Sequence, residues 1–160
     1  MRILGIDPGS TSMGYAVLDE VRGELRVVAY GTTTIAAKDL PGKLLLLDSQ
    51  LATIIRAHSP AIAGVERLFL ARNKKTAFEV AHARGVIMLS LLKSNIPTYE
   101  ITPNEVKIAV TNYGGSDKQM VAKMVMKILG LPKLSGDDNA ADALAVAIAT
   151  AGLARTSHLV

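Results

Sequence analysis

The chain has 160 residues, of which 49% are hydrophobic and 20% charged, so it is not an intrinsically disordered protein and is long enough for one domain with its own core. It contains no cysteine, which excludes disulfide frameworks, thiolate zinc sites and cysteine nucleophiles. The 18 basic and 14 acidic residues give a net charge of +4, a mild indication of a polyanionic partner.

No segment predicts export or membrane insertion. The N-terminal sequence MRILGIDPGS reaches Asp7 before an apolar signal-peptide region can develop. The longest uncharged apolar stretch near the end, residues 143–154, is far shorter than the roughly 20 residues that span a bilayer. We therefore expect a cytoplasmic protein with no membrane partner.

The first third of the chain predicts three strands and a helix. Runs rich in β-branched or alternating apolar residues cover 2–7, 13–19 and 24–34, and the short connections between them predict an antiparallel meander. Apolar residues at three- and four-residue spacing then predict a helix that ends at Ser59-Pro60. These helical positions are Leu44, Leu47, Leu51, Ile54 and Ile55.

Strands and helices alternate in the middle of the chain. The short apolar run 61–66 is typical of a strand in the centre of a sheet. A loop containing FLARNKK leads to a helix predicted over about 76–93, and a fifth strand follows at 97–101.

Capping signals delimit the last helices. Thr102-Pro103-Asn104-Glu105 is a capping box with proline at the first helical position, and Ser116-Asp117-Lys118-Gln119 repeats the pattern. Gly130 and Pro132 end the second of these helices, and the final helix is predicted over about 139–152. The order predicts one α/β domain over 1–153, a mixed sheet flanked by helices on both faces, and a C-terminal tail over 154–160.

Three carboxylates stand where burial is expected. Asp7 ends the first strand and Glu66 ends the fourth, so neighbouring strands would bring them together at one sheet edge. Two such carboxylates repel each other, and a divalent cation is the usual compensation. Asp142 is predicted on the inward face of the last helix. Each acid also has an ordinary interpretation: a turn aspartate for Asp7, a solvated strand end for Glu66, and a helix-dipole partner for Asp142.

Four blocks of the sequence resemble a known family. In order, they read LGIDPGSTSMGYAV, GVERLFLARNKKTAFEVAHARGV, PNEVKIAVTNYGGSDK and NAADALAVAIA. They span roughly residues 1–151 and resemble successive blocks of RuvC, the bacterial Holliday-junction resolvase family. The resemblance implies an RNase H-like fold with a five-stranded mixed sheet. It also implies an endonuclease that resolves four-way junctions by paired symmetric nicks, in homologous recombination and DNA repair.

The resemblance also implies a metal site. In the family, acids after the first strand, after the fourth strand and at the start of the last helix bind two Mg²⁺ ions, for which Mn²⁺ can substitute. The matching positions here are Asp7, Glu66, Asn139 and Asp142. The two ions would hydrolyse a phosphodiester by activating water and stabilising the leaving oxygen.

Asn139 departs from the family motif, which usually has an aspartate, sometimes a histidine, at this position. An amide oxygen can bind a hard cation, but it removes one negative charge from the site. Asn139 is a natural variant, or an introduced inactivating substitution, or a position replaced by the neighbouring Asp138. Because the change from Asp to Asn preserves shape while weakening metal binding, the sequence favours the second interpretation.

Basic residues provide the expected DNA contacts. Lys107 and Lys118 match basic, functionally important family positions and are candidates for stabilising charge on the phosphate. Arg67, Arg72, Asn73, Lys74 and Lys75 surround Phe69 in the loop after the fourth strand. Phe69 would stack on an unpaired base of the opened junction, as the family aromatic does, or it would close the hydrophobic core.

Symmetric nicking favours a homodimer. The predicted helix 76–93 has apolar residues on more than one face, so it packs on the sheet with one side and on a partner with the other, or it lies wholly inside the monomer. The resemblance alone implies the RuvA–RuvB branch-migration complex as a further partner. Two alternatives remain for function: a junction-binding module that has lost its chemistry, and a YqgF-type RNase H-like nuclease. An actin-like nucleotide binder would need a second domain, for which the chain is too short.

Overall fold

The computed structural model describes residues 1–67 and 74–157, with the side chains of the helix starting at Lys74 described from residue 77 onward. The strands are β1 (Arg2–Pro8), β2 (Ser12–Val21), β3 (Glu24–Thr34), β4 (Ile62–Glu66) and β5 (Thr98–Ile101). The helices are α1 (Leu40–His58), α2 (Lys74–Lys93), α3 (Pro103–Thr111), α4 (Lys118–Leu129) and α5 (Asp138–Ser157).

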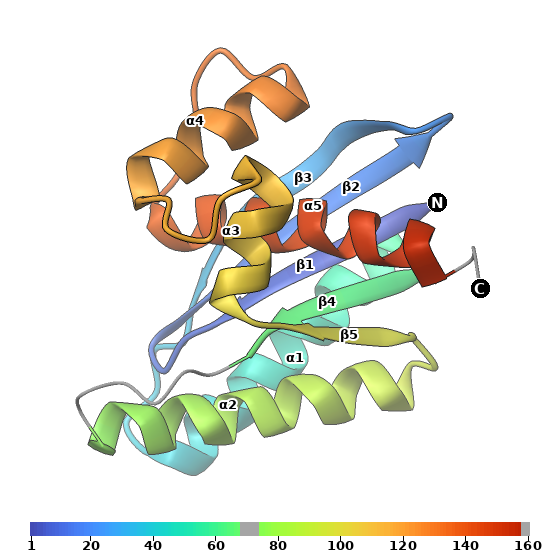
Figure 1. Cartoon of the computed structure of the whole chain (residues 1–160). Coiled ribbons are helices and arrows are strands. Elements are labelled where there is room, and N and C mark those ends of the chain that lie inside the picture. Colours follow the sequence, from blue (N-terminus) through green and yellow to red (C-terminus); the bar gives the residue numbers. More distant parts are fainter. Residues whose placement is uncertain (68–73, 158–160) are drawn as a thin grey trace.

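The five strands form one mixed sheet in the order β3-β2-β1-β4-β5 (Figure 1). β1 pairs antiparallel with β2, and β2 with β3, whereas β4 is parallel to both β1 and β5. The predicted fold class, with an antiparallel first half and a central fourth strand, is confirmed. The tight connection at Arg22-Gly23 has positive φ at both residues, 52° and 87°, as a two-residue hairpin turn requires.

Helices cover both faces of the sheet (Figure 1): α1 and α2 lie on one face, and α3, α4 and α5 on the other. Successive residues of β1 therefore enter two different cores. Ile3 packs in the core beneath α5, whereas Leu4 and Ile6 pack in the core beneath α1 and α2. Because side chains alternate along a strand, Asp7 falls on the α5 face.

The helix α5 lies unusually close to the sheet because three strands present glycine to it. A Cβ on Gly14 of β2 would overlap the carbonyl oxygen of Asn139, and one on Gly64 of β4 would overlap the hydroxyl of Thr150. A Cβ on Gly5 of β1 would overlap backbone atoms of α5. The missing side chains thus fix how closely α5 packs against the sheet.

Two details differ from the sequence prediction. α5 extends to Ser157 rather than ending near residue 152, because Ala154 is buried and Arg155 bonds to Glu20 of β2. The residues predicted as a tail from 154 therefore begin as helix.

The second detail concerns the start of α4. Its N-cap is Asp117, whose side chain accepts a hydrogen bond from the amide of Met120 at 2.8 Å. The Ser116 hydroxyl instead bonds to the preceding loop.

Across the described residues, no helix has the length and hydropathy needed to cross a membrane.

We expect Gly5→Ala to destabilise the protein by about 3 kcal/mol, because the new methyl group meets backbone atoms of α5 that cannot move aside. Urea unfolding followed by circular dichroism measures this change. Gly152→Ala, on α5 itself, is the control: its new methyl group meets no neighbouring atom and should raise stability by up to about 1 kcal/mol. Equal, small effects of both substitutions would contradict the close approach of α5.

Candidate active site

The sheet places two predicted site residues, Asp7 and Glu66, side by side. β1 and β4 are parallel neighbours, and their register pairs Ile6 with Val65, one residue before each acid. Both acids follow residues of the opposite face, so both side chains lie on the face covered by α5.

Burial dominates the electrostatics of this pair. It is the main cause that raises the pKa of Asp7 to about 6 and that of Glu66 to about 8. The negative charge of Asp142 raises both pKa values further. A hydrogen bond between the two carboxyl groups raises the pKa of Glu66 and lowers that of Asp7, so Glu66 carries the proton and Asp7 accepts it.

The first turns of α5 bring further predicted residues to the acids. Asp137 caps the helix by accepting a hydrogen bond from the amide of Ala140 at 3.2 Å. The Thr32 hydroxyl of β3 donates to the same carboxylate. Asn139 donates through Nδ2 to the Ser12 hydroxyl of β2 at 2.8 Å. Hydrogen bonds from two strands thus hold the segment that carries Asn139 and, one turn later, Asp142.

Two lysines complete the cluster. Lys118 Nζ lies 3.4 Å from Oδ2 of Asp142 and 3.7 Å from Oδ2 of Asp138, and the charge of Asp142 raises the pKa of Lys118. Lys107 on α3 and Lys118 on α4 line one cavity of about 270 Å³ together with Glu66 and Asp142. The structure therefore places both predicted lysines beside the acids.

The predicted DNA-binding loop is described only in part. Arg67 Nε lies 3.8 Å from Oε2 of Glu100, which also pairs with Arg84 of α2. Phe69, Arg72 and Asn73 lie outside the described residues, as do the side chains of Lys74 and Lys75.

Sequence reasoning missed the three polar residues that hold α5, namely Ser12, Thr32 and Asp137. An aspartate immediately before a helix is a capping signal, so Asp137 was detectable from sequence. Ser12 and Thr32 carried no such signal, because their partners are more than one hundred residues away in the chain.

The oxygen-rich cluster suits a hard divalent cation. Three carboxylates and one amide oxygen are ligands that Mg²⁺ accepts, and the charge of Lys118 offsets the raised pKa values of Asp7 and Glu66 only in part. As the side chains stand, residues 1–67 and 74–157 contain no group of three acidic or histidine side chains arranged to hold a metal ion. Asp142 is instead engaged by Lys118.

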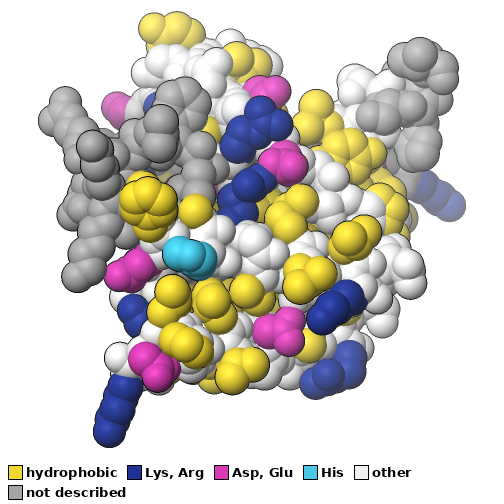
Figure 2. Space-filling model, turned by 90° about the horizontal axis from the view of Figure 1, so that it is seen from below, with side chains coloured by type: hydrophobic (Ala, Val, Ile, Leu, Met, Phe, Trp, Pro, Cys, Tyr) yellow, Lys and Arg dark blue, Asp and Glu magenta, His cyan; other side chains and the backbone are white. Residues whose placement is uncertain are grey.

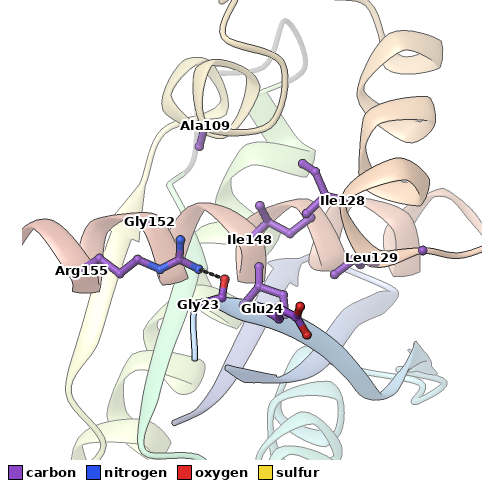
Figure 3. Close-up of a pocket in the computed structure, with 10 residues that line it drawn as sticks. Gly23, Glu24, Ala109, Ile128, Leu129, Ile148, Gly152 and Arg155 are labelled. Atoms are coloured by element: carbon purple, nitrogen blue, oxygen red, sulfur yellow. Dashed lines mark hydrogen bonds between the residues drawn. The ribbon is translucent and has the colours of Figure 1, made fainter. Parts of the chain in front are cut away.

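A larger cavity of about 560 Å³ lies elsewhere along α5 (Figure 3). Its lining combines the β2–β3 turn, the end of α4 and the second half of α5, where Arg155 donates to the carbonyl oxygen of Gly23 at 3.3 Å. None of the predicted site residues lines it. The chemistry-bearing cluster is therefore the smaller cavity beside Glu66.

Sequence relatives agree on one family. The family model described as "Crossover junction endodeoxyribonuclease RuvC" matches residues 3–150. A protein of that name from Chloroflexus aggregans is 46% identical over 157 residues, covering 98% of this chain and 96% of the relative. One from Roseiflexus sp. is 45% identical over 148 residues, covering 92% of this chain and 88% of the relative.

Solved structures agree as well. A Thermus thermophilus RuvC structure superposes with a TM-score of 0.89 at 28% identity, covering 98% of this chain and 97% of the other. T. thermophilus RuvC in complex with Holliday junction substrate superposes with a TM-score of 0.91, also at 28% identity, covering 98% and 96% of the two chains. The yeast mitochondrial resolvase Ydc2 shares the fold, with a TM-score of 0.72 at 16% identity, over 98% of this chain and 80% of the other. These matches favour one family over the YqgF-type and actin-like alternatives, and the chain belongs to the crossover junction endodeoxyribonuclease RuvC family.

Proposed function

We propose that the protein is a structure-specific endonuclease that resolves four-way DNA junctions by hydrolysing phosphodiester bonds. The observation that carries this proposal is the pair of half-buried carboxyl groups, Asp7 and Glu66, next to Asp142 and two lysines. Family membership supports the choice of substrate, because a related protein was solved with a Holliday junction.

The residues that would hold Mg²⁺ are Asp7, Glu66, Asn139 and Asp142. Bound divalent cations would supply Lewis-acid chemistry, lowering the pKa of water and offsetting charge on the scissile phosphate. Asp7 and Glu66 would hold the cations in their ionised forms, which requires Glu66 to lose the proton that it shares with Asp7.

Lys107 and Lys118 would bind the non-bridging phosphate oxygens on which negative charge gathers in the transition state. Both line the cavity that contains Glu66, so a phosphate in this cavity meets cations on its outer side. Lys118 would then exchange its contact with Asp142 for the phosphate, which leaves the Asp142 carboxylate free as a ligand.

Asn139 would bind a cation through its amide oxygen. Its Nδ2 group is engaged by Ser12, so Oδ1 is the atom that remains to bind a cation. A neutral ligand lowers the negative charge of the site, and cation binding should be weaker than with an aspartate. The second candidate function, junction binding without cleavage, rests on the same residue.

We expect the protein to nick a synthetic four-way junction at symmetric positions with Mg²⁺, and Asn139→Asp to lower the Mg²⁺ concentration needed for half-maximal nicking by about tenfold, because the site regains one charge. Gel analysis of end-labelled junctions across an Mg²⁺ titration measures both. Asp142→Asn is the opposite control and should abolish nicking. Junction binding without cuts, with cuts restored by Asn139→Asp, would instead support the second candidate function.

The metal-free protein should lose stability as the pH rises. Glu66 has a pKa of about 8 when folded and an ordinary value of 4.5, so between these values the folded state holds a proton that the unfolded chain releases. The free energy of unfolding therefore falls with rising pH over this window. In EDTA we expect Tm to drop by about 5 °C between pH 5.5 and 8.5.

Two controls separate this effect from other titrations. Glu66→Gln removes the group with the larger shift and should flatten the dependence of Tm on pH above about pH 6.5, leaving only the contribution of Asp7, whose pKa of about 6 falls at the acidic end of the window. Groups with lowered pKa values, such as Asp19 and Glu105, are already ionised at pH 5.5 and contribute no slope there. A metal-free Tm that rises towards pH 8.5 would contradict the assignment.

We further propose that the active form is a homodimer, because a junction needs two symmetric nicks. The helix α2 supports a dimer, because one side of it is buried in the core while the other side exposes large apolar side chains. The alternative that this helix lies wholly inside the monomer is therefore wrong. Figure 2 shows hydrophobic side chains gathered on this side of the molecule. The buried positions are Ala83, Ile87 and Leu91, and the exposed ones are Phe78, Leu89 and Leu92. An interaction with the RuvA–RuvB complex is proposed on family membership alone.

Phe78→Lys should weaken the dimer at least tenfold, because Phe78 is 68% exposed in the monomer and would become buried against a partner. Sedimentation equilibrium measures the dissociation constant. Val21→Lys is the matched control, since Val21 is 46% exposed at the far end of β2 and should leave dimerisation unchanged. A monomeric unsubstituted protein, or equal losses in both variants, would contradict a dimer through α2.

A further inference from the structure

The connection between α3 and α4, residues 112–117, presents an exposed aromatic side chain. Tyr113 is 68% exposed, whereas the other three tyrosines, Tyr15, Tyr30 and Tyr99, pack against the two cores. An exposed tyrosine in a loop contributes little to the core.

The backbone of Tyr113 is held in place by two hydroxyl groups. The Tyr113 amide donates to Oγ1 of Thr111 at 3.1 Å. Its carbonyl oxygen accepts from the Ser116 hydroxyl at 2.8 Å and from the Ser116 amide at 3.2 Å. The two hydroxyls also bond to each other at 2.7 Å, and Ser116 is buried. The exposed ring thus stands on a fixed base.

Two glycines allow close contacts in this connection, one with the Tyr113 ring and one with α3. A Cβ on Gly115 would lie 2.6 Å from Cζ of Tyr113, so the ring lies directly against the Gly115 backbone. A Cβ on Gly114 would overlap Oδ1 of Asn104, so the loop packs on the first turn of α3. One side of the ring is covered by backbone, and the high exposure leaves the other side open to solvent.

The loop joins the two lysines of the candidate active site. The Thr111 hydroxyl donates to the carbonyl oxygen of Lys107 at 2.8 Å, and Lys118 follows Ser116 by two residues. Both lysines line the cavity beside Glu66. Along the chain, Tyr113 therefore lies between two lysines that are candidates for binding phosphate. Proteins bind unpaired nucleotides by combining aromatic side chains that stack on bases with cations that neutralise the backbone.

We propose that Tyr113 stacks on an unpaired nucleobase of the DNA strand whose phosphates are bound by Lys107 and Lys118. This inference rests on the proposed function, and it adds a base contact from the α3–α4 connection to the one expected of Phe69. The ring contributes affinity through its face rather than its hydroxyl, so phenylalanine should replace it.

The chain contains no tryptophan, so Tyr113→Trp introduces a single fluorescent reporter. We expect its emission to fall by at least half when the full-length variant, in EDTA to prevent hydrolysis, is titrated with a four-way junction or a short single-stranded oligonucleotide. A fully paired duplex of equal charge should cause little quenching. Unchanged emission with bound junction, in a protein that nicks junctions normally, would overturn the stacking and leave the proposed function intact.

A substitution series separates stacking from packing. Tyr113→Phe should keep the affinity for the junction, whereas Tyr113→Ala and Tyr113→Leu should each weaken it about tenfold without lowering Tm. If Tyr113→Leu binds as well as Tyr113→Phe, or if Tyr113→Ala loses stability instead of affinity, the ring merely covers Gly115 and the proposal is wrong. If the unsubstituted protein binds no DNA at all, the proposed function fails together with it.

Discussion

The close packing of α5 on the sheet is the constraint on which the site depends. Three strands lack side chains where the helix crosses them, at Gly14, Gly5 and Gly64, so the helix backbone touches the sheet. A helix held at the usual distance by intervening side chains would carry Asp142 away from Asp7 and Glu66. The electrostatic coupling of these three acids is therefore a consequence of residues that have no chemistry of their own.

The same packing accounts for the raised pKa values of Asp7 and Glu66. α5 covers the face on which Asp7 and Glu66 lie, which removes water from both carboxyl groups and raises their pKa values. Lys118 is the nearest compensating cation, but it pairs with Asp142 and reaches the buried pair only through its charge. Once Glu66 is ionised, the three carboxylates outnumber Lys107 and Lys118, and a divalent cation would supply the missing positive charge.

The sequence predicted the parts of this site that are local in the chain. Asp7 and Glu66 each end an apolar run, so their proximity was predicted on the condition that the two strands are neighbours, and the sheet order meets that condition. The end of α5 was placed too early because Gly152 resembles a helix stop, whereas the buried Ala154 continues the packed face. The contacts of Ser12 with Asn139 and of Thr32 with Asp137 were not predictable, because they depend on the rotation of a helix against strands far away in the chain.

Three helix N-termini converge on the acid cluster, and this convergence explains how a negatively charged site can also receive a phosphate. The cavity beside Glu66 is lined by residues from the first turns of α3 and α4 and from the second turn of α5, including Pro103, Lys118 and Asp142. Each helix start carries partial positive charge from its unpaired amides, and side-chain caps satisfy only some of these groups. The Thr102 side chain caps the amide of Glu105 in α3, and the Asp117 side chain caps the amide of Met120 in α4. The side of the cavity formed by α3 and α4 is consequently electropositive, while the sheet edge is electronegative. A phosphodiester between them would face cations and amides with its charged oxygens, and carboxylates with its reacting bond.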